Sequence, residues 1–442
     1  ACIQMPRKGS RYGIAFLDIS TGTFKVAEGS LDYVDILISD FGPKEILVER
    51  SYVEGFRSRF NTKAYITTMD EWAFVYDSCR TKVLGQMGTD TLKGFGIERM
   101  PLAITSAGAA LFYLEMTRHT DLGHIGRIER IDSNDFVWMD GFTVRNLEIF
   151  HSLAGSAGTS LVDIMDHCSS PMGARKLRQY LARPLKDKKA INARYDMVEA
   201  FVNNPELLET VSERLREVGD LERIVAKAAA GRILPREALQ IARSLENTAR
   251  IRTALSSDKA FSGLARKLDD CTELFKLLTE TLLPDAAAAV GKGDVISSSV
   301  DEELRTLRNT LTHGKDILLE IQQREKEATG IPSLKIGYNN VFGYYLEVTN
   351  THKSKVPEDW IRKQTLTNGE RYITPELKEL EDKILGAEDK ILEIETRLFN
   401  EFVLGLIDYM PMIQLDARLI ARLDVLQCFA SVSVENNYSK PV

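Results

Sequence analysis

The sequence has few cysteines and no long apolar run, and these two absences bound the class of protein. Its five cysteines, Cys2, Cys79, Cys168, Cys271 and Cys428, are scattered without a C-x-x-C pair. Such spacing argues against a disulfide framework or a zinc knuckle and fits a reducing cytoplasm. No apolar stretch approaches the ~18 residues of a membrane span, and none near the start resembles a secretory signal. We therefore expect a cytoplasmic protein without a transmembrane segment.

Motifs of several enzyme classes are also missing. The sequence contains no G-x-x-x-x-G-K-[ST] phosphate loop, and its six histidines show neither H-x-x-x-H nor H-E-x-x-H spacing. We therefore predict that this chain holds no nucleotide or metal cofactor. The net charge of −7 argues against a whole-molecule field that attracts nucleic acid, so contact with a polyanion needs a local patch.

Asp18 is the strongest candidate for catalysis. It lies in the β-rich run "RYGIAFLDIS", and ribonuclease-H-like nucleases hold a metal with an acid in such a strand. Two divalent ions need further carboxylates, for which Glu45, Glu49 and Asp70 are available, although no spacing requires them. We favour a role in capping the turn that follows at Ser20, and predict that the chain is not an enzyme. A metal-dependent nuclease is the enzyme-class alternative.

The first quarter of the chain has the texture of an α/β domain. A hairpin is predicted where "RYGIAFLDIS" meets "TFKVAEG" across the Thr21-Gly22 turn. The run "LDYVDILISDF" has helical spacing, ends at Gly42-Pro43 and precedes the short strand "KEILVE". Two further helices are predicted near 70–86 and 102–118.

From about residue 142 the sequence becomes nearly all helical. In "SSPMGARKLRQYLARPL", Ser170 is the expected N-cap and Pro171 takes the first helical position. Amphipathic runs such as "PELLETVSERLREV" and "LPREALQIARSLENTARIRTAL" follow. Together they predict a helix bundle of about 150 residues or more.

Two later segments carry the heptad pattern of a long helix pair. Apolar residues alternate at steps of three and four with charged residues between them, as in a coiled coil. The first seam consists of Val300, Leu304, Leu307, Leu311, Gly314, Leu318 and Ile321. The second consists of Leu377, Leu380, Ile384, Ala387, Ile391, Ile394 and Leu398. At ~1.5 Å per residue, each helix extends at least about 30 Å and the second about 45 Å.

The stretch between the two seams, residues 333–374, is rich in Tyr, Val, Ile, Thr and Asn and predicts a small β module at the far end of an antiparallel helix pair. Residues 334–374 hold six Lys and Arg against four Asp and Glu. The cations gather in "HKSK" and "RKQTLTNGER", where hydroxyl and amide groups can also bond phosphate oxygens. This predicts sequence-blind, salt-dependent clamping of a nucleic-acid backbone. A solvated loop with ordinary charges is the alternative.

The stretch "YNNVFGYYLEVTNTHKSKVPEDWIRKQTLTNGERYITPELKELEDKI" closely resembles the clamp of the bacterial MutS family of DNA mismatch repair proteins. "VRNLEIFHSLAG", "GTSLVDIMDHCSSPMGARKLRQYLARPL" and "VGDLERIVAKAAAGRILPREAL" are similar to the core helices of that family. "YGIAFLDISTGTF" with "GPKEILV" is similar to its connector domain. The resemblance is collinear and covers nearly the whole chain.

The resemblance implies a multidomain α+β fold. Its parts are a ribonuclease-H-like α/β connector without nuclease activity (1–118), an all-α core with the first lever helix (119–332), a small β-rich clamp (333–376), and the second lever helix returning to the core (377–442). The two long lever helices are antiparallel and carry the clamp. No Phe-x-Glu mismatch-reading motif precedes Arg11 and no Walker sequence follows, so we expect a middle fragment of such a protein.

The clamp resemblance also implies a binding site. It places Asn368 against the DNA backbone, with polar residues before it in the same turn. The predicted DNA-binding residues are Arg362, Lys363, Gln364, Thr365, Asn368, Arg371, Lys353 and Lys355. Arg145 and Arg175 match the family as well, and we expect them to brace helices through ion pairs and carbonyls.

Partners follow from the same resemblance. They are double-stranded DNA at the clamp, a MutL-type partner at the connector, and a second copy in the intact protein, which forms a homodimer. ATP and Mg belong to the ATPase domain of intact family members, so no cofactor is expected in this chain. A coiled-coil scaffold whose β module binds protein is the structural-class alternative.

Overall fold

The computed structural model describes residues 1–6, 9–117, 122–131, 136–137, 139–155, 158–339, 341 and 343–441, without the side chain of Lys315. It divides into unit 1 (residues 1–278 and 403–442) and unit 2 (279–402). The domain boundary expected between residues 118 and 119 lies outside the described residues. Within the described ranges, no helix is long and apolar enough to cross a membrane.

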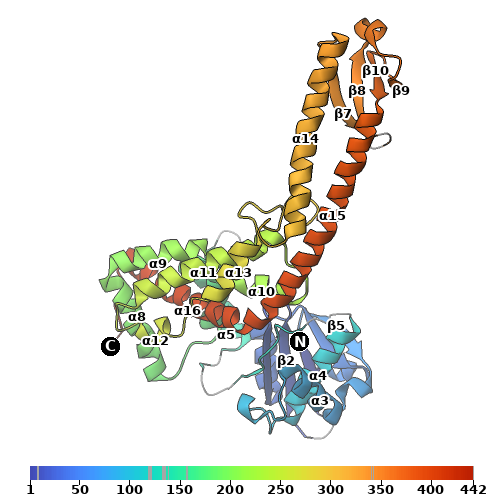
Figure 1. Ribbon diagram of the computed structural model, residues 1–442. Helices are drawn as coiled ribbons and strands as arrows, with labels where there is room; N and C mark the ends of the chain where they lie inside the picture. The colour runs from blue at the N-terminus through green and yellow to red at the C-terminus, as the bar shows by residue number, and fades with distance from the viewer. Residues whose placement is uncertain are drawn as a thin grey trace. The chain divides into compact units, whose positions relative to one another are not determined.

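Unit 1 contains a six-stranded mixed sheet in the order β5-β4-β1-β2-β3-β6 (Figure 1). Its strands are β1 (Cys2–Gln4), β2 (Tyr12–Asp18), β3 (Thr23–Gly29), β4 (Glu45–Glu49), β5 (Tyr65–Met69) and β6 (Glu129–Arg130). β2 pairs with β1 and β3 in antiparallel fashion, whereas the β1–β4, β4–β5 and β3–β6 pairs are parallel. The hairpin that the sequence predicts is β2–β3, and it is confirmed.

Helices cover both faces of this sheet. Ile14 and Phe16 of β2 pack with α1 (Leu31–Phe41), whereas Ala15 between them packs with α4 (Pro101–Met116). A Cβ at Gly13 would lie 2.2 Å from the Leu102 carbonyl group, so only glycine lets α4 approach β2 this closely. The predicted helix end is also confirmed, because Gly42 caps α1 in the left-handed conformation.

Short helices connect these elements. They are η1 (Arg50–Tyr52), α2 (Val53–Arg57), η2 (Glu71–Phe74), α3 (Tyr76–Met87) and η3 (Lys93–Phe95). The remaining helices of the all-helical part are α5 (Gly141–Asn146), α6 (Leu161–Met165), α7 (Pro171–Ala182), α8 (Lys188–Asn203), α9 (Pro205–Glu217), α10 (Leu221–Ala229), α11 (Pro235–Leu255), α12 (Ser262–Ala265), α13 (Thr272–Thr281), η6 (Leu406–Tyr409) and α16 (Met410–Glu435).

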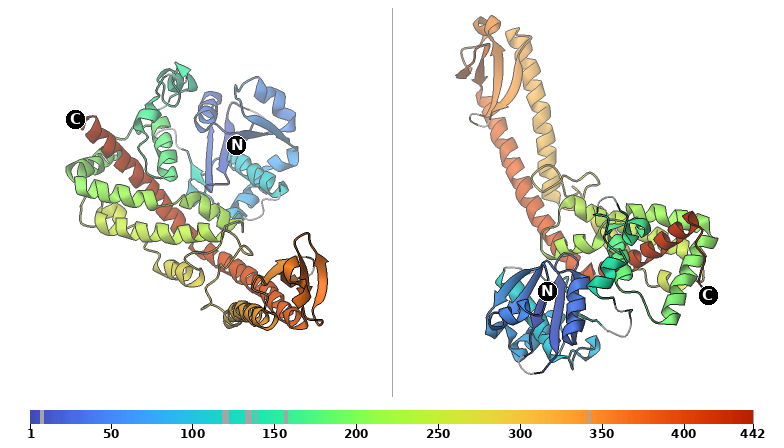
Figure 2. Two further views of the ribbon diagram at one scale, coloured as in Figure 1. Left: turned by 90° about the horizontal axis from the view of Figure 1, so that it is seen from above. Right: turned by 180° about the vertical axis from the view of Figure 1, so that it is seen from behind.

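The helix bundle is organised around α16. Figure 2 shows α16 among the helices of the bundle, and it contacts α7, α8, α9 and α10. The predicted cap of α7 is confirmed, since the Ser170 hydroxyl accepts the Gly173 amide at 3.0 Å. Arg175 braces α7 by donating to Asp220 and Glu222 at 2.6 to 2.8 Å, as expected. The bracing role of Arg145 in α5 stays a prediction.

Unit 2 is built from two long helices and a small sheet. α14 (Glu302–Thr329) and α15 (Pro375–Gly405) run antiparallel, and the sheet lies where α14 ends and α15 begins (Figure 1). Its strands are β7 (Lys335–Asn339), β8 (Gly343–Thr349), β9 (Ile361–Thr365) and β10 (Gly369–Ile373), in the all-antiparallel order β7-β8-β10-β9. α15 begins as the sequence predicts, with the Thr374 hydroxyl accepting the Leu377 amide at 3.2 Å.

The heptad seams of the two helices do more than pair with each other. Near the sheet, Leu318 of α14 and Leu380 of α15 join one apolar cluster with Leu346 of β8. The helices approach closely at Gly314, where a Cβ would lie 2.9 Å from Ile384. Val300 precedes α14 and is 41% exposed, so its assignment to the seam is wrong. An apolar stripe specifies burial and not which element covers it.

Candidate nucleic-acid interface

Two of the predicted contact residues lie on the face of the small sheet that points away from α14 and α15. Arg371 of β10 donates to Glu347 at 3.0 Å and to Gln364 at 2.9 Å. Its guanidinium lies 4.3 Å from the ring centre of Tyr345. These contacts leave the Arg371 side chain 20% exposed. Arg371 and Gln364 therefore hold neighbouring strands together, and their polar groups are already engaged.

Glu370 gathers two further predicted residues. Its carboxylate belongs to a side chain only 5% exposed and lies 3.0 Å from the Lys353 ammonium and 3.3 Å from the Arg362 guanidinium. The Tyr372 hydroxyl donates to it as well. The bonds from Tyr372 and Lys353 hold the pKa of Glu370 below its ordinary value, while burial and Glu370 raise the pKa of Tyr372 to about 12. Lys353 and Arg362 thus share one carboxylate of the protein itself.

Lys363 lies at an irregularity in the ladder between β9 and β10. Gln364 pairs with Arg371, and Arg362 pairs with Tyr372, so Lys363 has no residue opposite it. Such a bulge twists a strand and redirects the side chain at that position. The Lys363 side chain is exposed, and it forms no ion pair with any residue that the structure describes. It is therefore the predicted cation that an external phosphate can reach most easily.

The turn between β9 and β10 is fastened through its backbone. Asn350 donates its amide to the Asn368 carbonyl at 3.1 Å and its side chain to the Thr367 carbonyl at 2.8 Å. Asn350 opens the 3-10 helix η5 (Asn350–Lys355), so η5 and the β9–β10 turn lie side by side. These bonds use carbonyl groups of the turn and not its side chains. The side chains of Thr365 and Asn368 are exposed.

Lys355 contributes to the same end of unit 2. Its ammonium donates to the Gly330 carbonyl at 3.0 Å, and Gly330 caps α14 in the left-handed conformation. A cation at a helix C-terminus neutralises the partial negative charge of the last carbonyls. Lys355 therefore stabilises the end of α14 and fixes η5 to it.

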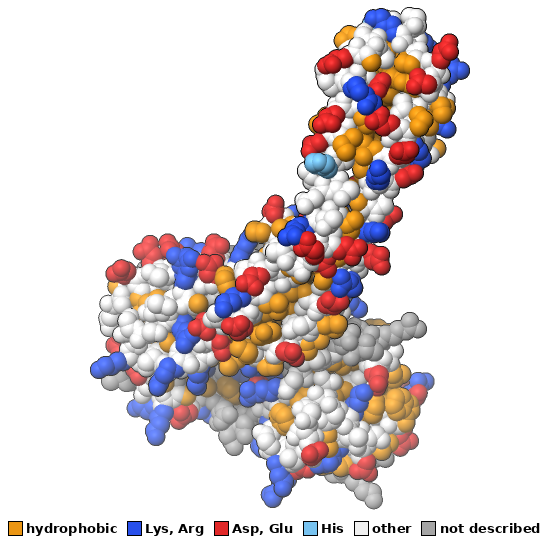
Figure 3. All heavy atoms as spheres, viewed as in Figure 1, with side chains coloured by type: hydrophobic (Ala, Val, Ile, Leu, Met, Phe, Trp, Pro, Cys, Tyr) orange, Lys and Arg blue, Asp and Glu red, His pale blue; other side chains and the backbone are white. Residues whose placement is uncertain are grey.

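The structure brings the eight predicted residues to one sheet and its turns. They fall into two groups, those with side chains that are exposed and those with side chains that already bond within the protein. Lys363, Thr365 and Asn368 have exposed side chains without a bond to any residue that the structure describes, whereas the other five already bond within the protein. On the face that Figure 3 shows, acidic and basic side chains are interspersed at this end of unit 2.

Two residues that organise this end, Glu370 and Asn350, were not predicted from the sequence. The alternation in "GERYI" carries a signal for Glu370, because it places Glu370 on the face of Tyr372, toward the core. For Asn350 the sequence carries no such signal. Its partners, Thr367 and Asn368, lie well beyond it in the chain, and only the pairing of β8 with β10 brings them together.

Asp18 in unit 1 has the turn-capping role that the sequence favours. Its carboxylate accepts the Ser20 amide at 2.8 Å and the Ser20 hydroxyl at 2.7 Å, which confirms that role. The carboxylates nominated with Asp18 have partners elsewhere, in the pairs Glu45 with Tyr113, Glu49 with Ser51, and Asp70 with Arg50. Across the described ranges, no cluster of three or more His, Cys, Asp or Glu side chains could hold a metal.

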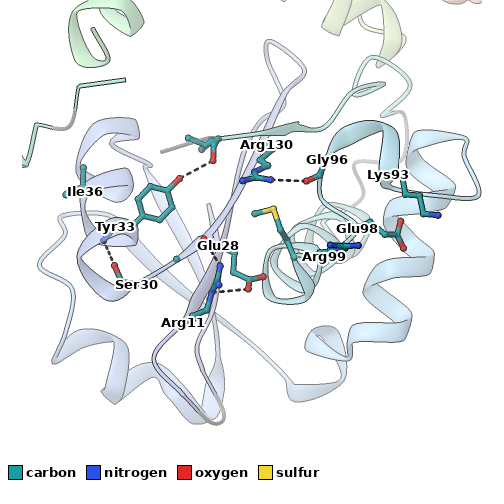
Figure 4. A pocket seen from close by; sticks show the side chains of 13 residues that line it. Arg11, Glu28, Ser30, Tyr33, Ile36, Lys93, Gly96, Glu98, Arg99 and Arg130 are labelled. Atoms are coloured by element: carbon teal, nitrogen blue, oxygen red, sulfur yellow. Dashed lines mark hydrogen bonds and ion pairs between the residues drawn. The ribbon is translucent and has the colours of Figure 1, made fainter. Parts of the chain in front are cut away.

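Unit 1 also has a cavity of about 790 Å³ between the start of α1 and the start of α4, which we call the α1–α4 cavity. Figure 4 shows Arg11 beside Glu28 and Arg130 beside Gly96 on its walls. Glu28 accepts the Leu102 amide at 3.0 Å and so caps α4. The carboxylate on this wall is thus occupied by protein donors.

Comparison with known proteins adds a family to this geometry. The family model described as MutS domain II matches residues 1–126, and that described as MutS domain III matches residues 142–430. A protein of Phocaeicola vulgatus named "DNA mismatch repair protein MutS" is 50% identical over 97% of this chain and 50% of its own length. Proteins of the same name from Bacteroides thetaiotaomicron and Porphyromonas gingivalis are 49% and 46% identical, over 97% and 98% of this chain and 50% and 48% of their own lengths. The chain therefore spans about half the length of the curated relatives it matches.

Proposed function

This chain belongs to the MutS family, and from that premise we propose that it contacts the sugar-phosphate backbone of duplex DNA through the end of unit 2 formed by η5 and the β9–β10 turn. The observation that carries the proposal is the exposed group of Lys363, Thr365 and Asn368, the first two on β9 and the third in the turn that follows it. An ammonium neutralises a phosphate, and hydroxyl and amide groups donate to its oxygens. Because side chains of this kind do not distinguish base edges here, we propose binding that is blind to sequence.

The five engaged residues support this contact indirectly. Lys355 and the Arg371–Gln364 pair fix the sheet and η5, so the exposed groups sit on a scaffold with little conformational freedom. Lys353 and Arg362 keep their cations at the same end, with a single carboxylate between them. We propose that a phosphate competes with Glu370 for these two cations when DNA is bound.

We assign α14 and α15 the role of lever helices and the four-stranded sheet the role of the clamp. α14 has 28 residues and α15 has 31, which corresponds to about 40 and 45 Å. Helices of that length suit a device that holds a DNA contact away from the helical core. In this proposal the connector (1–118), core (119–332), clamp (333–376) and returning helix (377–442) act as one relay between DNA and the ATPase of the intact protein.

The wider role is mismatch repair, the activity in the printed names of the relatives. We propose that the intact protein binds ATP and Mg in its ATPase domain, works as a homodimer in the cytoplasm, and docks a MutL-type partner on the α/β part of unit 1. The part of the protein in this chain would then bind DNA without being an enzyme.

Duplex binding by this chain across salt concentrations tests the proposal. Fluorescence anisotropy with a labelled duplex should give a Kd that weakens steeply between about 50 and 200 mM salt. Changing Lys363 and Asn368 together to Ala should weaken binding about tenfold at the lowest salt, because one phosphate loses its cation and one its amide donor.

The matched control changes Lys335 and Asn339 to Ala. Both belong to β7, on the opposite edge of the same sheet. This pair should leave Kd within about twofold of the parent value. A salt-independent Kd, or equal losses in the two double variants, would contradict the proposal and favour the scaffold that binds protein.

A further inference from the structure

A second cavity of unit 1, of about 760 Å³, lies between the β2–β3 turn and helices α7 and α16, and we call it the α7–α16 cavity. Three positions on α7, Lys176, Gln179 and Arg183, recur at helical spacing, so one face of α7 lines it. Gln414 and Arg418 of α16 follow the same spacing on another wall. This volume matches a small molecule of drug size, since such sites measure about 300 to 1,000 Å³.

The walls of the α7–α16 cavity are basic in an acidic chain. Seven Lys and Arg residues line it against four Asp and Glu residues, whereas the whole chain has a net charge of −7. Two of the cations have acidic partners of their own. Arg175 binds Asp220 and Glu222, and Arg183 lies 3.8 Å from Asp40 and 3.9 Å from the ring centre of Phe41.

Four of the five remaining cations, all except the exposed Lys44, act on one carboxylate, that of Glu129. Glu129 lies 3.1 Å from the Lys25 ammonium and 3.4 Å from the Arg127 guanidinium. Lys176 has only a 3.4 Å bond to the neutral Gln179 and a ring contact to Tyr180.

Arg418 forms no ion pair within the residues that the structure describes. Lys25, Arg127, Lys176 and Arg418 therefore all act on Glu129. Glu222 also acts on Lys176 and Arg418, but its carboxylate is bound by Arg175.

Burial and the neighbouring charges shift the pKa values of the charged groups around this cavity. Desolvation, together with Lys25, lowers the pKa of Lys176, and desolvation with Arg127 lowers that of Arg418. Burial alone would raise the pKa of Glu129, but Lys25 and Arg127 bring it below its ordinary value. The protein thus keeps cations that repel one another around an open volume, an arrangement that an anion would relieve.

We propose that the α7–α16 cavity binds an oligophosphate anion, held by Lys25, Arg127, Lys176 and Arg418. Guanidinium and ammonium groups form their strongest hydrogen bonds with phosphate oxygens. The side-chain amide of Gln179 can supply a neutral donor on the same walls. The volume is too small for a duplex, which separates this site from the DNA contact proposed for unit 2.

The α1–α4 cavity serves as an internal contrast. There the cation Arg11 lies 3.4 Å from Glu28, and Glu98 receives Arg80 at 2.9 Å. Cations exceed carboxylates here too, because Lys93, Arg99 and Arg130 also line this cavity. Among the described residues, however, Glu28 and Glu98 each have one cation at ion-pair distance, whereas Glu129 has two, Lys25 and Arg127. The sharing of Glu129 distinguishes the α7–α16 cavity.

Isothermal titration calorimetry of this chain with inorganic tripolyphosphate at low salt tests the proposal. We expect binding to one site, and a loss of about tenfold in affinity in Arg418→Gln and in Lys176→Gln, because each removes one charge-assisted contact. Arg418→Lys keeps the charge and should recover most of the affinity. Circular dichroism spectra that match the parent chain establish that each variant is folded.

Two controls separate this site from the rest of the molecule. Lys363→Gln, in unit 2, and Arg250→Gln, on α11, should leave tripolyphosphate binding unchanged. ATP in place of tripolyphosphate distinguishes a nucleotide from a free oligophosphate, and tighter binding of either supports the site. No binding, equal affinity in Arg418→Gln and the parent chain, or displacement by a short oligonucleotide but not by ATP would overturn the proposal.

Discussion

Unit 2 and helix α16 of unit 1 accommodate their buried carboxylates in different ways. In unit 2, three glutamates are 5% exposed or less, and each lies within ion-pair distance of a Lys or Arg. The pairs are Glu370 with Lys353, Glu381 with Lys378, and Glu395 with Arg308. In unit 1, Asp416 and Asp424 of α16 are fully buried, and neither has a Lys or Arg within ion-pair distance among the described residues.

Backbone amides take the place of cations in unit 1. Asp416 accepts the Asp269 amide at 3.0 Å, and Asp424 accepts the Ser169 and Ser170 amides at 2.8 Å. Burial outweighs these bonds, raising the pKa of Asp416 to about 7 and raising that of Asp424 as well. The stability of unit 1 is therefore expected to depend on pH near neutrality, whereas the stability of unit 2 is expected to depend on intact ion pairs.

The largest expected effect comes from breaking an ion pair of unit 2. Arg308 donates to Glu395 at 2.6 Å and to the Ile296 carbonyl at 2.8 Å, and the two charged side chains are 13% and 3% exposed. Arg308→Met leaves the Glu395 carboxylate buried without a cation. We expect a loss of about 3 to 5 kcal/mol in the free energy of unfolding, measured by urea denaturation.

Arg305→Met on the same helix is the matched control. Arg305 pairs with Glu302 three residues away, and the two side chains are 56% and 75% exposed. Exposed pairs of this kind contribute little, so we expect less than about 0.5 kcal/mol. Similar costs for the two variants would contradict the prediction, because the burial of the Arg308–Glu395 pair would then not matter.

Asp416→Asn tests the buried carboxylate of unit 1. The pKa of Asp416 is about 7 in the folded chain against 3.8 for the ordinary group. Between pH 3.8 and pH 7, the folded chain therefore holds a proton on Asp416 that the unfolded chain has lost. Stability therefore falls as pH rises from about 4 to 7 and is constant above. The amide keeps the bond from Asp269 and never ionises. We expect Asp416→Asn to be more stable than the parent chain by about 2 kcal/mol at pH 8, and similar at pH 5.

Thermal or urea unfolding at several pH values measures this difference. Asp408→Asn, at an exposed position of η6 close to α16 in sequence, controls for the removal of one negative charge. A gain at pH 8 in both variants would indicate net charge as the cause. An unchanged pH dependence in Asp416→Asn would contradict the assignment of proton-linked stability to this carboxylate.

A third change uses the Glu370 carboxylate at the sheet of unit 2. Glu370→Gln leaves the strand in place but removes the charge that holds Lys353 at 3.0 Å and Arg362 at 3.3 Å. If these cations meet phosphate, their release should strengthen duplex binding about threefold at low salt. Glu347→Gln is the control, because Arg371 stays engaged with Tyr345 and Gln364. Weaker binding by Glu370→Gln would show that the pair positions the cations and does not compete for them.

Local spacing explains why much of this fold could be predicted from the sequence. The Ser170 and Thr374 caps, the Gly42 end of α1 and the β2–β3 hairpin each depend on residues within one or two turns of the chain. The exposed turn of Asn368 was also predictable, because polar and Gly residues between strand-like runs specify a turn.

The rest depends on partners far away in the chain. β1 and β5 have 3 and 5 residues, too short for an alternation to identify. They are strands because the sheet supplies partners, β4 and β2 on the two sides of β1, and β4 on one side of β5. Asp424 caps α7 from 254 residues away. The bulge at Lys363 likewise arises from the register of β9 on β10. Nothing in the local sequence marks these residues. Their roles depend on contacts with strands and helices that are distant in the chain.

The smallest expected effect concerns that bulge. Lys363→Gln removes one exposed cation, so duplex binding should weaken about twofold and the salt slope should become shallower by about 1. Lys335→Gln removes an equally exposed cation from the opposite edge of the sheet and should change neither. Equal changes would mean that DNA senses only the total charge of unit 2. A difference between the two would assign the contact to the β9 edge, where the register and not the composition of the sequence leaves a lysine unpaired.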